Sequence, residues 1–331
     1  MAVVYITEDD TQLSKTGERL VVRRGSQVLA DIPLVKVDQV VVLGNVSLTP
    51  PAIDLLLAAD IPVGFLTYSG RYRGALTPPF SKNSLLRRAQ YRAAEDGRQT
   101  LELARWFVQG KLTNMRALML RATRGERDAA SEEAIRNVKI YIDKTAVAAE
   151  VDTVRGYEGV GSKAYFSVFG RELKEGWYFN GRSRRPPRDP VNALLSFGYT
   201  LLFNEVMSAV SLAGFDPYIG YLHAAKYSKP ALALDLMEEF RPIVVDSVVK
   251  SVINKGVLQP DDLQEVYGTY ELRKAGTRKF LEQYEARLRT EVNHPYFEYS
   301  ATLRRCLHLQ VRLVAKYLMG EIPAYQPFTS R

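Results

Sequence analysis

The pattern of hydrophobic and polar positions divides the chain near residue 85. Before that point, short runs rich in Val, Ile and Leu, such as "VVYIT" and "VDQVVVLG", alternate with turn signals at "RRGSQ" and at Gly70. Runs of this length between turn residues indicate strands and hairpins. The stretch "PPAIDLLLAAD" from Pro50 indicates a helix, because proline is tolerated in a first helical turn. We therefore expect a small, mostly β domain over residues 1–85.

Beyond residue 85 the apolar residues recur at three- and four-residue spacing almost to Gly320, which is the helical period. The segment "TPPFSKNS" at 77–84 combines prolines with polar residues and is typical of a linker. The predicted fold class is α+β, with the small β-rich domain followed by a larger all-α domain over residues 86–331. The sequence contains no internal repeat and no low-complexity tail.

Length and composition are those of a globular protein. The chain has 331 residues and 46% hydrophobic content, enough to bury a large core. Its longest uncharged apolar run, Val191 to Asn204, is too short to span a bilayer. No signal-peptide pattern follows Met1. Cys306 is the single cysteine, so we expect no disulfides and a reducing, cytoplasmic location without a membrane partner.

Charge is distributed unevenly along the chain. The formal net charge is +8, and residues 1–85 carry eight basic and eight acidic residues, so the whole excess follows residue 85. A basic excess on one domain is expected of a protein that binds a polyanion, most often nucleic acid. A merely soluble basic surface would give the same count, and charge alone does not separate the two.

Three stretches of the helical part differ from plain core, and the first is "RGYEGVGSKAYFSVFGREL" at 155–173. Glu158 shares a helix face with Tyr165 and Phe169, seven and eleven residues further on. A carboxylate on an aromatic stripe faces inward or into a cleft, where it needs a cation partner. Gly159 and Gly161 weaken a helix, which suggests that something large approaches the backbone. A glutamate in a frayed first turn is the simpler alternative.

The second stretch is "WYFNGRSRRPPRDPVNALLSFGY" at 177–199. Arginine forks match phosphate oxygens, and aromatic rings can stack on exposed bases. Asp189 followed by Pro190 predicts the start of a helix. The candidate phosphate-binding arginines are Arg182, Arg184, Arg185 and Arg188, and the helix carries a polar stripe of Asn192, Ser196 and Tyr199. The alternative is a loop whose arginines pair with acidic neighbours and a stripe that faces solvent.

The third stretch, "GYLHAAKYSKPALALDLMEEFRP" at 220–242, combines a histidine with an acidic but otherwise apolar helix. At 100° per residue, Asp235, Glu238 and Glu239 fall within about 100° of one another. Clustered carboxylates repel unless protons or a cation neutralise them. A divalent metal would do so, and His223 could supply a nitrogen ligand. An acidic surface helix beside a core histidine is the competing interpretation.

Together the three stretches contain the parts of a metal-dependent phosphodiester enzyme. Carboxylates and a histidine would bind the cation, which would offset charge in the transition state, while arginines would hold the nucleic-acid backbone. The sequence offers no Ser/His/Asp chain order, no Cys-x-x-Cys zinc pair and no glycine-rich phosphate loop.

The three segments also resemble one known family over essentially the whole chain. "GYEGVGSKAYF", "RSRRPPRDPVNALLSFGYTLL" and "GYLHAAKYSKPALALDLMEEFRP", in this order, are similar to segments of the CRISPR-associated spacer-acquisition integrase, the universal DNA endonuclease of CRISPR adaptation. The resemblance implies Glu158, His223 and Glu238 as ligands of Mg²⁺ or Mn²⁺. It places Asp235 beside them as a further catalytic acid. Some members have Asp where this chain has Glu238, and Glu239 is the alternative third ligand.

The resemblance further implies what the protein does and what it binds. Members form homodimers, here expected to use the N-terminal domain, and assemble with the small second Cas protein. They join the 3′-hydroxyl ends of short foreign double-stranded DNA to the CRISPR repeat by transesterification, as part of antiviral defence. Lys163 joins the arginines and the polar stripe as a predicted DNA contact. A branched-DNA nuclease acting in repair and a non-catalytic DNA-binding scaffold remain the alternatives.

Overall fold

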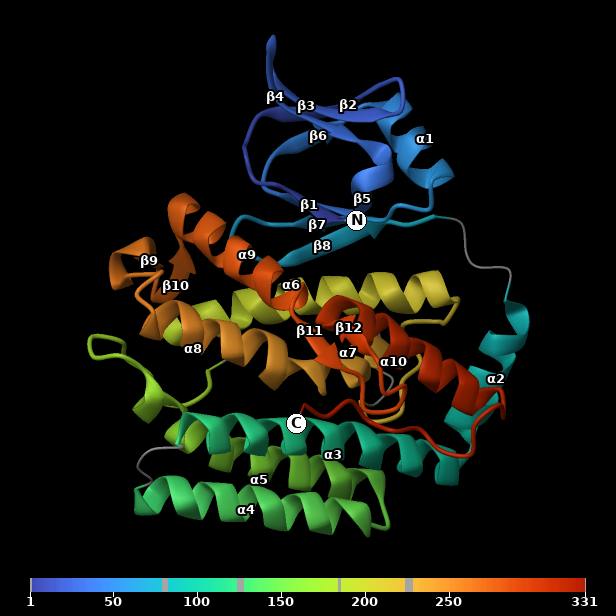
Figure 1. The fold of residues 1–331 in the computed structure, drawn as a ribbon, viewed down its shortest axis with the longest axis vertical. Coiled ribbons are helices and arrows are strands. Elements are labelled where there is room, and N and C mark those ends of the chain that lie inside the picture. The colour runs from blue at the N-terminus through green and yellow to red at the C-terminus, as the bar shows by residue number, and fades with distance from the viewer. Residues whose placement is uncertain (1, 79–82, 124–127, 184–185, 224–228, 331) are drawn as a thin grey trace. The chain divides into compact units, whose positions relative to one another are not determined.

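The computed structural model describes residues 2–78, 83–123, 128–183, 186–223 and 229–330 (Figure 1). The chain separates into two compact units, one ending at residue 81 and the other beginning at residue 82. The predicted α+β class is confirmed, because a β-rich region over residues 2–76 precedes a mostly helical region.

In its described part, the N-terminal unit combines two four-stranded sheets with helix α1. The sheet orders are β1-β5-β7-β8 and β4-β3-β2-β6. The elements are β1 (Ala2–Ile6), β2 (Thr11–Thr16), β3 (Arg19–Arg24), β4 (Gln27–Pro33), β5 (Val37–Leu43), β6 (Val46–Leu48), α1 (Pro50–Ala58), β7 (Val63–Leu66) and β8 (Tyr72–Leu76). The strands of both sheets and α1 share one apolar core, in which Leu13, Val40 and Leu56 are buried.

The local sequence explains this arrangement. β5 is buried along nearly its whole length between two parallel neighbours, as a continuous apolar run requires. The hairpin predicted from "RRGSQ" joins β3 to β4, with Arg24 paired to Gln27 across a two-residue turn. Gly25 in that turn has a φ of +57°, a left-handed conformation that glycine adopts without steric cost.

The second unit is built mainly of helices, and it carries two short hairpins that the helical periodicity did not predict. Its helices are α2 (Ser84–Glu95), α3 (Gly97–Ala122), α4 (Ala129–Ala146), α5 (Val151–Phe169), α6 (Pro190–Ala213), α7 (Ala231–Met237), α8 (Ser247–Asn254), α9 (Lys274–Leu288) and α10 (Leu303–Leu318), with a π-helical segment at Arg241–Asp246. The hairpins pair β9 (Leu263–Val266) with β10 (Thr269–Leu272) and β11 (Glu291–Asn293) with β12 (Ser300–Thr302). Helices α3, α4 and α5 pack together along one side of this unit (Figure 1).

Helix α6 lies in the core of the second unit. The carboxylate of Asp189 accepts the backbone N–H of Asn192 at 2.7 Å, and Pro190 occupies the first turn, so the predicted helix start is confirmed. The helix is long and apolar enough to cross a membrane, but 67% of its apolar window is buried inside the unit. Burial of this extent is typical of a core helix.

A largely buried arginine connects three of the helices. The guanidinium of Arg304 on α10 contacts Glu205 on α6 at 3.0 and 3.1 Å and Glu285 on α9 at 2.6 and 3.1 Å. Burial would lower the pKa of Arg304, but the two carboxylates outweigh it and raise the pKa above its usual range. The guanidinium therefore stays charged and holds both acids.

We predict that Arg304→Met lowers the free energy of unfolding by about 3–5 kcal/mol, because the buried Glu205 and the largely buried Glu285 lose the guanidinium that donates two hydrogen bonds to each of them. Lys139→Met, in the same unit, is the control. It removes a half-exposed pair with Asp143 on α4 and should cost no more than about 0.5 kcal/mol. Urea denaturation of both variants measures the difference. Equal losses of unfolding free energy in the two variants would show that the contacts of Arg304 stabilise the fold no more than an exposed ion pair does.

Candidate active site

The centre of the site is a buried lysine between two glutamates. Lys111 on α3 is 3% exposed, and its Nζ forms ion pairs with Glu158 on α5 and with Oε2 of Glu238, the latter at 2.7 Å. Glu238 follows the last residue of α7. Nε of Arg241 lies 3.1 Å from the other oxygen of Glu238. Three segments far apart in the sequence thus bring two acids and two bases together.

The electrostatics keep these groups charged. Burial acts to raise the pKa of Glu238, but Arg241, Lys111 and His223 outweigh it and hold the pKa at about 2. Burial likewise acts to lower the pKa of Lys111, and the charges of Glu238 and Glu158 reverse that effect and raise it. Glu238 is consequently a carboxylate, and Lys111 an ammonium, at any physiological pH.

A glycine lets the two helices approach. A Cβ at Gly161 would lie 2.7 Å from Cδ2 of Leu112, so α5 packs close against α3 at this point. The glycine pair in the sequence predicted that something large approaches the backbone here. At Gly161 this neighbour is helix α3. Gly159 has nothing within 4 Å of such a Cβ. Ser162 also donates its hydroxyl to Oε1 of Glu158 at 3.1 Å, which fixes the carboxylate further.

Asp235 organises the histidine. Its buried carboxylate accepts the backbone N–H groups of Tyr221, Leu222 and His223 at 2.6, 2.9 and 2.9 Å. Oδ1 of Asp235 also lies 2.7 Å from Nδ1 of His223. A carboxylate on one ring nitrogen orients an imidazole so that the other, here Nε2, can bind a ligand. Asp235 is thus positioned to orient His223.

Glu239 faces a different part of the unit. Its carboxylate accepts the hydroxyl of Tyr325 and the backbone N–H of Phe328, each at 2.7 Å, and Nε2 of Gln310 at 3.2 Å. Burial raises the pKa of Glu239 to about 8. The acid therefore anchors the C-terminal segment rather than joining Glu158, which favours Glu238 as the candidate third ligand.

The side chains of Glu158, Glu238 and His223 are of the types that bind a hard divalent cation. In this structure they do not surround a common cation position. Among the described residues, no three acidic, histidine or cysteine side chains are placed to hold a metal ion. Lys111 lies between the two glutamates instead. Oε2 of Glu238 is buried, and its contact with Lys111 falls short of hydrogen-bond geometry. Two carboxylates and an imidazole are nevertheless ligands that Mg²⁺ and Mn²⁺ accept.

The arginine loop and its polar stripe contact each other. Arg182 donates to Oδ1 of Asn192 at 2.7 Å and to Oγ of Ser196 at 3.2 Å, and its guanidinium lies 5.4 Å from the ring centre of Tyr199. Asn192 is fully buried and Tyr199 is 9% exposed. In this structure the stripe supports the loop, because Asn192 and Ser196 accept hydrogen bonds from Arg182 and the ring of Tyr199 lies beside its guanidinium.

The remaining predicted DNA contacts fall into two groups. Arg188 and Lys163 are exposed, so both are accessible to a ligand. Arg184 and Arg185 lie outside the described residues.

Tyr199 connects the arginine loop to the acidic cluster. The guanidinium of Arg241 lies 4.5 Å from the centre of the Tyr199 ring, and the Tyr199 hydroxyl donates to Asp246 at 2.5 Å.

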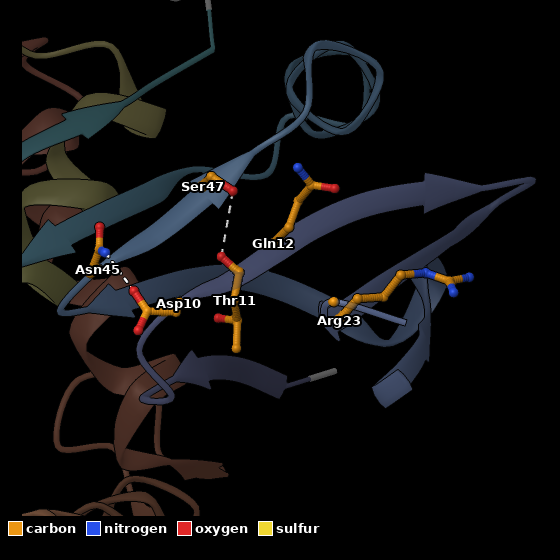
Figure 2. A pocket seen from close by; sticks show the side chains of 7 residues that line it. Asp10, Thr11, Gln12, Arg23, Asn45 and Ser47 are labelled. Atoms are coloured by element: carbon orange, nitrogen blue, oxygen red, sulfur yellow. Dashed lines mark hydrogen bonds between the residues drawn. The ribbon is translucent and has the colours of Figure 1, made fainter. Parts of the chain in front are cut away.

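A hollow of about 330 Å³ lies in the N-terminal unit and is distinct from this cluster (Figure 2). Its polar groups are partly satisfied among themselves, because Asn45 donates to Asp10 at 2.8 Å and Ser47 to the carbonyl of Thr11 at 3.4 Å. None of the predicted site residues contributes to it. The lining residues are Asp10, Thr11, Gln12, Arg23, Gly25, Asn45 and Ser47.

Two members of the site, Lys111 and Arg241, were not predicted from the sequence. A signal for Lys111 was present, because it lies four residues after Phe107 and four before Met115 on a buried stripe of α3. A lysine at such a position requires a partner. Arg241 follows Glu238 by three residues, a spacing at which helical side chains can meet.

Comparison with known proteins identifies the family. The family model described as CRISPR-associated protein Cas1 matches residues 4–286, and the chain belongs to this family. A CRISPR-associated endonuclease Cas1 from Thermus thermophilus is 39% identical, over 100% of this chain and 98% of the relative.

Solved structures agree with this assignment. A Cas1 protein from Thermotoga maritima matches with a TM-score of 0.84 and 26% identity, over 100% of both chains. A chain of a Cas6-RT-Cas1–Cas2 complex matches with a TM-score of 0.83 and 26% identity, over 98% of this chain and 36% of that one. The family resemblance inferred from the three sequence segments is confirmed.

Gly220 is a position where added volume would disturb the site. A Cβ there would lie 2.6 Å from the carbonyl carbon of Ala231 and 2.7 Å from Oδ2 of Asp235. We predict that Gly220→Ala lowers the free energy of unfolding by about 1–3 kcal/mol, because backbone or Asp235 must move.

Gly159→Ala is the matched control, since its Cβ would meet nothing within 4 Å inside α5. Its expected effect is a stabilisation of up to about 1 kcal/mol from helix propensity. Urea denaturation measures both variants, and a neutral Gly220→Ala would contradict the tight packing of residue 220 against Asp235.

Proposed function

We propose that this Cas1 family member is a divalent-metal-dependent DNA endonuclease and integrase of CRISPR adaptation. It joins the 3′-hydroxyl ends of short foreign DNA fragments to the CRISPR repeat. The observation that carries the proposal is the ion-pair cluster of Glu158, Lys111, Glu238 and Arg241, in which Lys111 and Glu238 are buried. Asp235 orients His223 on the chain segment that leads into this cluster. Family membership connects this cluster to DNA chemistry.

Glu158, His223 and Glu238 would hold Mg²⁺ or Mn²⁺. When bound, the ion would supply Lewis acidity toward a phosphodiester oxygen. Asp235 holds the imidazole of His223 and the backbone N–H groups of residues 221 to 223 in place, so the nitrogen ligand needs little reorganisation. Arg241 holds one oxygen of Glu238 and thereby orients its carboxylate.

The exposed basic side chains would bind the DNA backbone. Arg188 at the arginine loop and Lys163 on α5 supply positive charge on the unit that carries the whole basic excess. Arg182 orders the loop through Asn192 and Ser196. Binding through such contacts positions the DNA without reading its sequence.

The reaction is a transesterification in which bonds balance. The oxygen of a fragment's 3′-hydroxyl forms a bond to a phosphorus of the repeat, and the bond from that phosphorus to the repeat's own 3′ oxygen breaks. The attacking hydroxyl loses a proton, and the departing oxygen gains one. One phosphodiester replaces another, so the step requires no nucleotide energy source.

The partners follow from the same proposal. Double-stranded DNA is the substrate, and the small protein Cas2 is the assembly partner, as the name of the similar Cas6-RT-Cas1–Cas2 complex suggests. We further propose a homodimer that uses the N-terminal unit, located in the cytoplasm and without a membrane partner.

A strand-transfer assay tests the catalytic assignment. With a labelled 3′-hydroxyl duplex, a repeat target and Mn²⁺, Glu158→Gln, His223→Ala and Glu238→Gln should each lose about 10²-fold or more in rate. Asp235→Ala should lose about 10–100-fold, because it acts through His223. DNA binding should remain nearly intact, since the arginines provide the ground-state affinity. Wild-type rates for Glu158→Gln or Glu238→Gln would refute the assignment.

A salt titration tests the DNA-binding residues separately. Arg188→Ala should reduce the slope of log affinity against log salt concentration by about 0.7–0.9, the value for one lost phosphate contact. Lys139→Ala on α4, which already pairs with Asp143, is the control and should leave the slope unchanged. An unchanged slope for Arg188→Ala would mean that this residue does not contact phosphate.

A further inference from the structure

Lys111 occupies the space between the two proposed carboxylate ligands. Its ammonium pairs with both Glu158 and Glu238, and the side chain is 3% exposed. A buried ammonium is costly unless it is paired and hydrogen-bonded, so this lysine depends on the two acids. The acids depend equally on the lysine, because two carboxylates at one site repel each other.

The cluster is electrically balanced without a metal ion. Glu158 and Glu238 carry two negative charges, and Lys111 and Arg241 carry two positive charges at ion-pair distance. A divalent cation entering this cluster would leave it with an excess of positive charge. The cost of that excess is high inside a protein, where charges interact more strongly than in water.

We propose that Lys111 is a built-in counter-ion that holds Glu158 and Glu238 in the metal-free protein and competes with the divalent cation for them. This inference rests on the proposed function, in which the two glutamates are metal ligands. Lys111 thereby stabilises the metal-free fold and lowers the affinity for the metal. Its long side chain can leave the acids by rotation while α3 stays in place.

The backbone around the lysine is fixed, which makes such an exchange possible without loss of the site. Asn114, one turn after Lys111, donates to the carbonyls of Glu239 and Phe328 at 2.8 Å each. It also accepts the backbone N–H of Ser330 at 2.9 Å. Helix α3 is therefore bonded to the residue next to Glu238, and Glu158 keeps the hydrogen bond from Ser162, so both acids retain a contact that does not involve the ammonium.

The test combines two Lys111 variants with a matched control. Lys111→Met removes the charge at similar length, and Lys111→Gln keeps polar contacts in case the first variant does not fold. Lys250→Met is the control, because Lys250 is a buried lysine, 7% exposed, paired with Glu172 on another part of the unit. Mn²⁺ affinity is measured by calorimetry, and melting temperature is measured in chelator and in saturating Mn²⁺.

We expect both Lys111 variants to bind Mn²⁺ about tenfold or more tightly than the wild type, since close charge pairs are worth at least that factor. Their melting temperatures should fall in chelator and recover in Mn²⁺ more than that of the wild type, because ligand binding stabilises the folded state. Lys250→Met should be destabilised in both conditions, with unchanged Mn²⁺ affinity. Unchanged or weaker Mn²⁺ binding by both Lys111 variants would overturn the inference.

Glu158→Gln separates this inference from the proposed function. If Mn²⁺ binding depends on Glu158 but not on Lys111, the competition is refuted and the metal site stands. If Glu158→Gln binds Mn²⁺ as tightly as the wild type, the glutamate is no ligand, and both the metal site and the competition are refuted.

Discussion

The ion pairs of Lys111 with Glu158 and Glu238 are the interaction on which the candidate site depends. Each glutamate comes from a different segment, and the buried Glu238 could not lie beside the partly buried Glu158 without a positive charge between them. The lysine in turn is buried only because the acids compensate it. Mutual compensation of this kind places α3, α5 and the end of α7 in one arrangement, since moving any of them would leave a buried charge unpaired.

Two acids next to this cluster have positioning roles that their neighbours define. Asp235 collects three backbone N–H groups and the imidazole of His223, and so shapes the turn that carries the histidine. Glu239 collects donors from the C-terminal segment and α10. The consecutive residues Glu238 and Glu239 thus have different neighbours. Glu238 contacts Lys111 of the candidate site, and Glu239 contacts the C-terminal segment. The C-terminal segment thus holds the residue next to Glu238.

Neighbouring side chains also hold the arginines at and near the arginine loop. Arg182 is held by Asn192, Ser196 and the ring of Tyr199, and Arg241 lies over that ring as well as beside Glu238. Tyr199 therefore connects the loop proposed to bind DNA with the acidic cluster proposed to act on it. The stripe that the sequence predicted to contact DNA contacts Arg182 of this loop in the folded unit.

The sequence by itself determined the α+β class through hydrophobic periodicity. It also determined the hairpin at Gly25 and the helix start at Asp189, through turn and capping residues that act locally. The sequence also marked the three segments proposed to carry the chemistry, through their charged residues and their resemblance to one family. Only the tertiary structure decided what faces those residues. Regular helical spacing ends at Met237, so a helical wheel could not separate Glu238 from Glu239. Lys111 is 47 residues from Glu158, and no local pattern specifies which helix covers a given face.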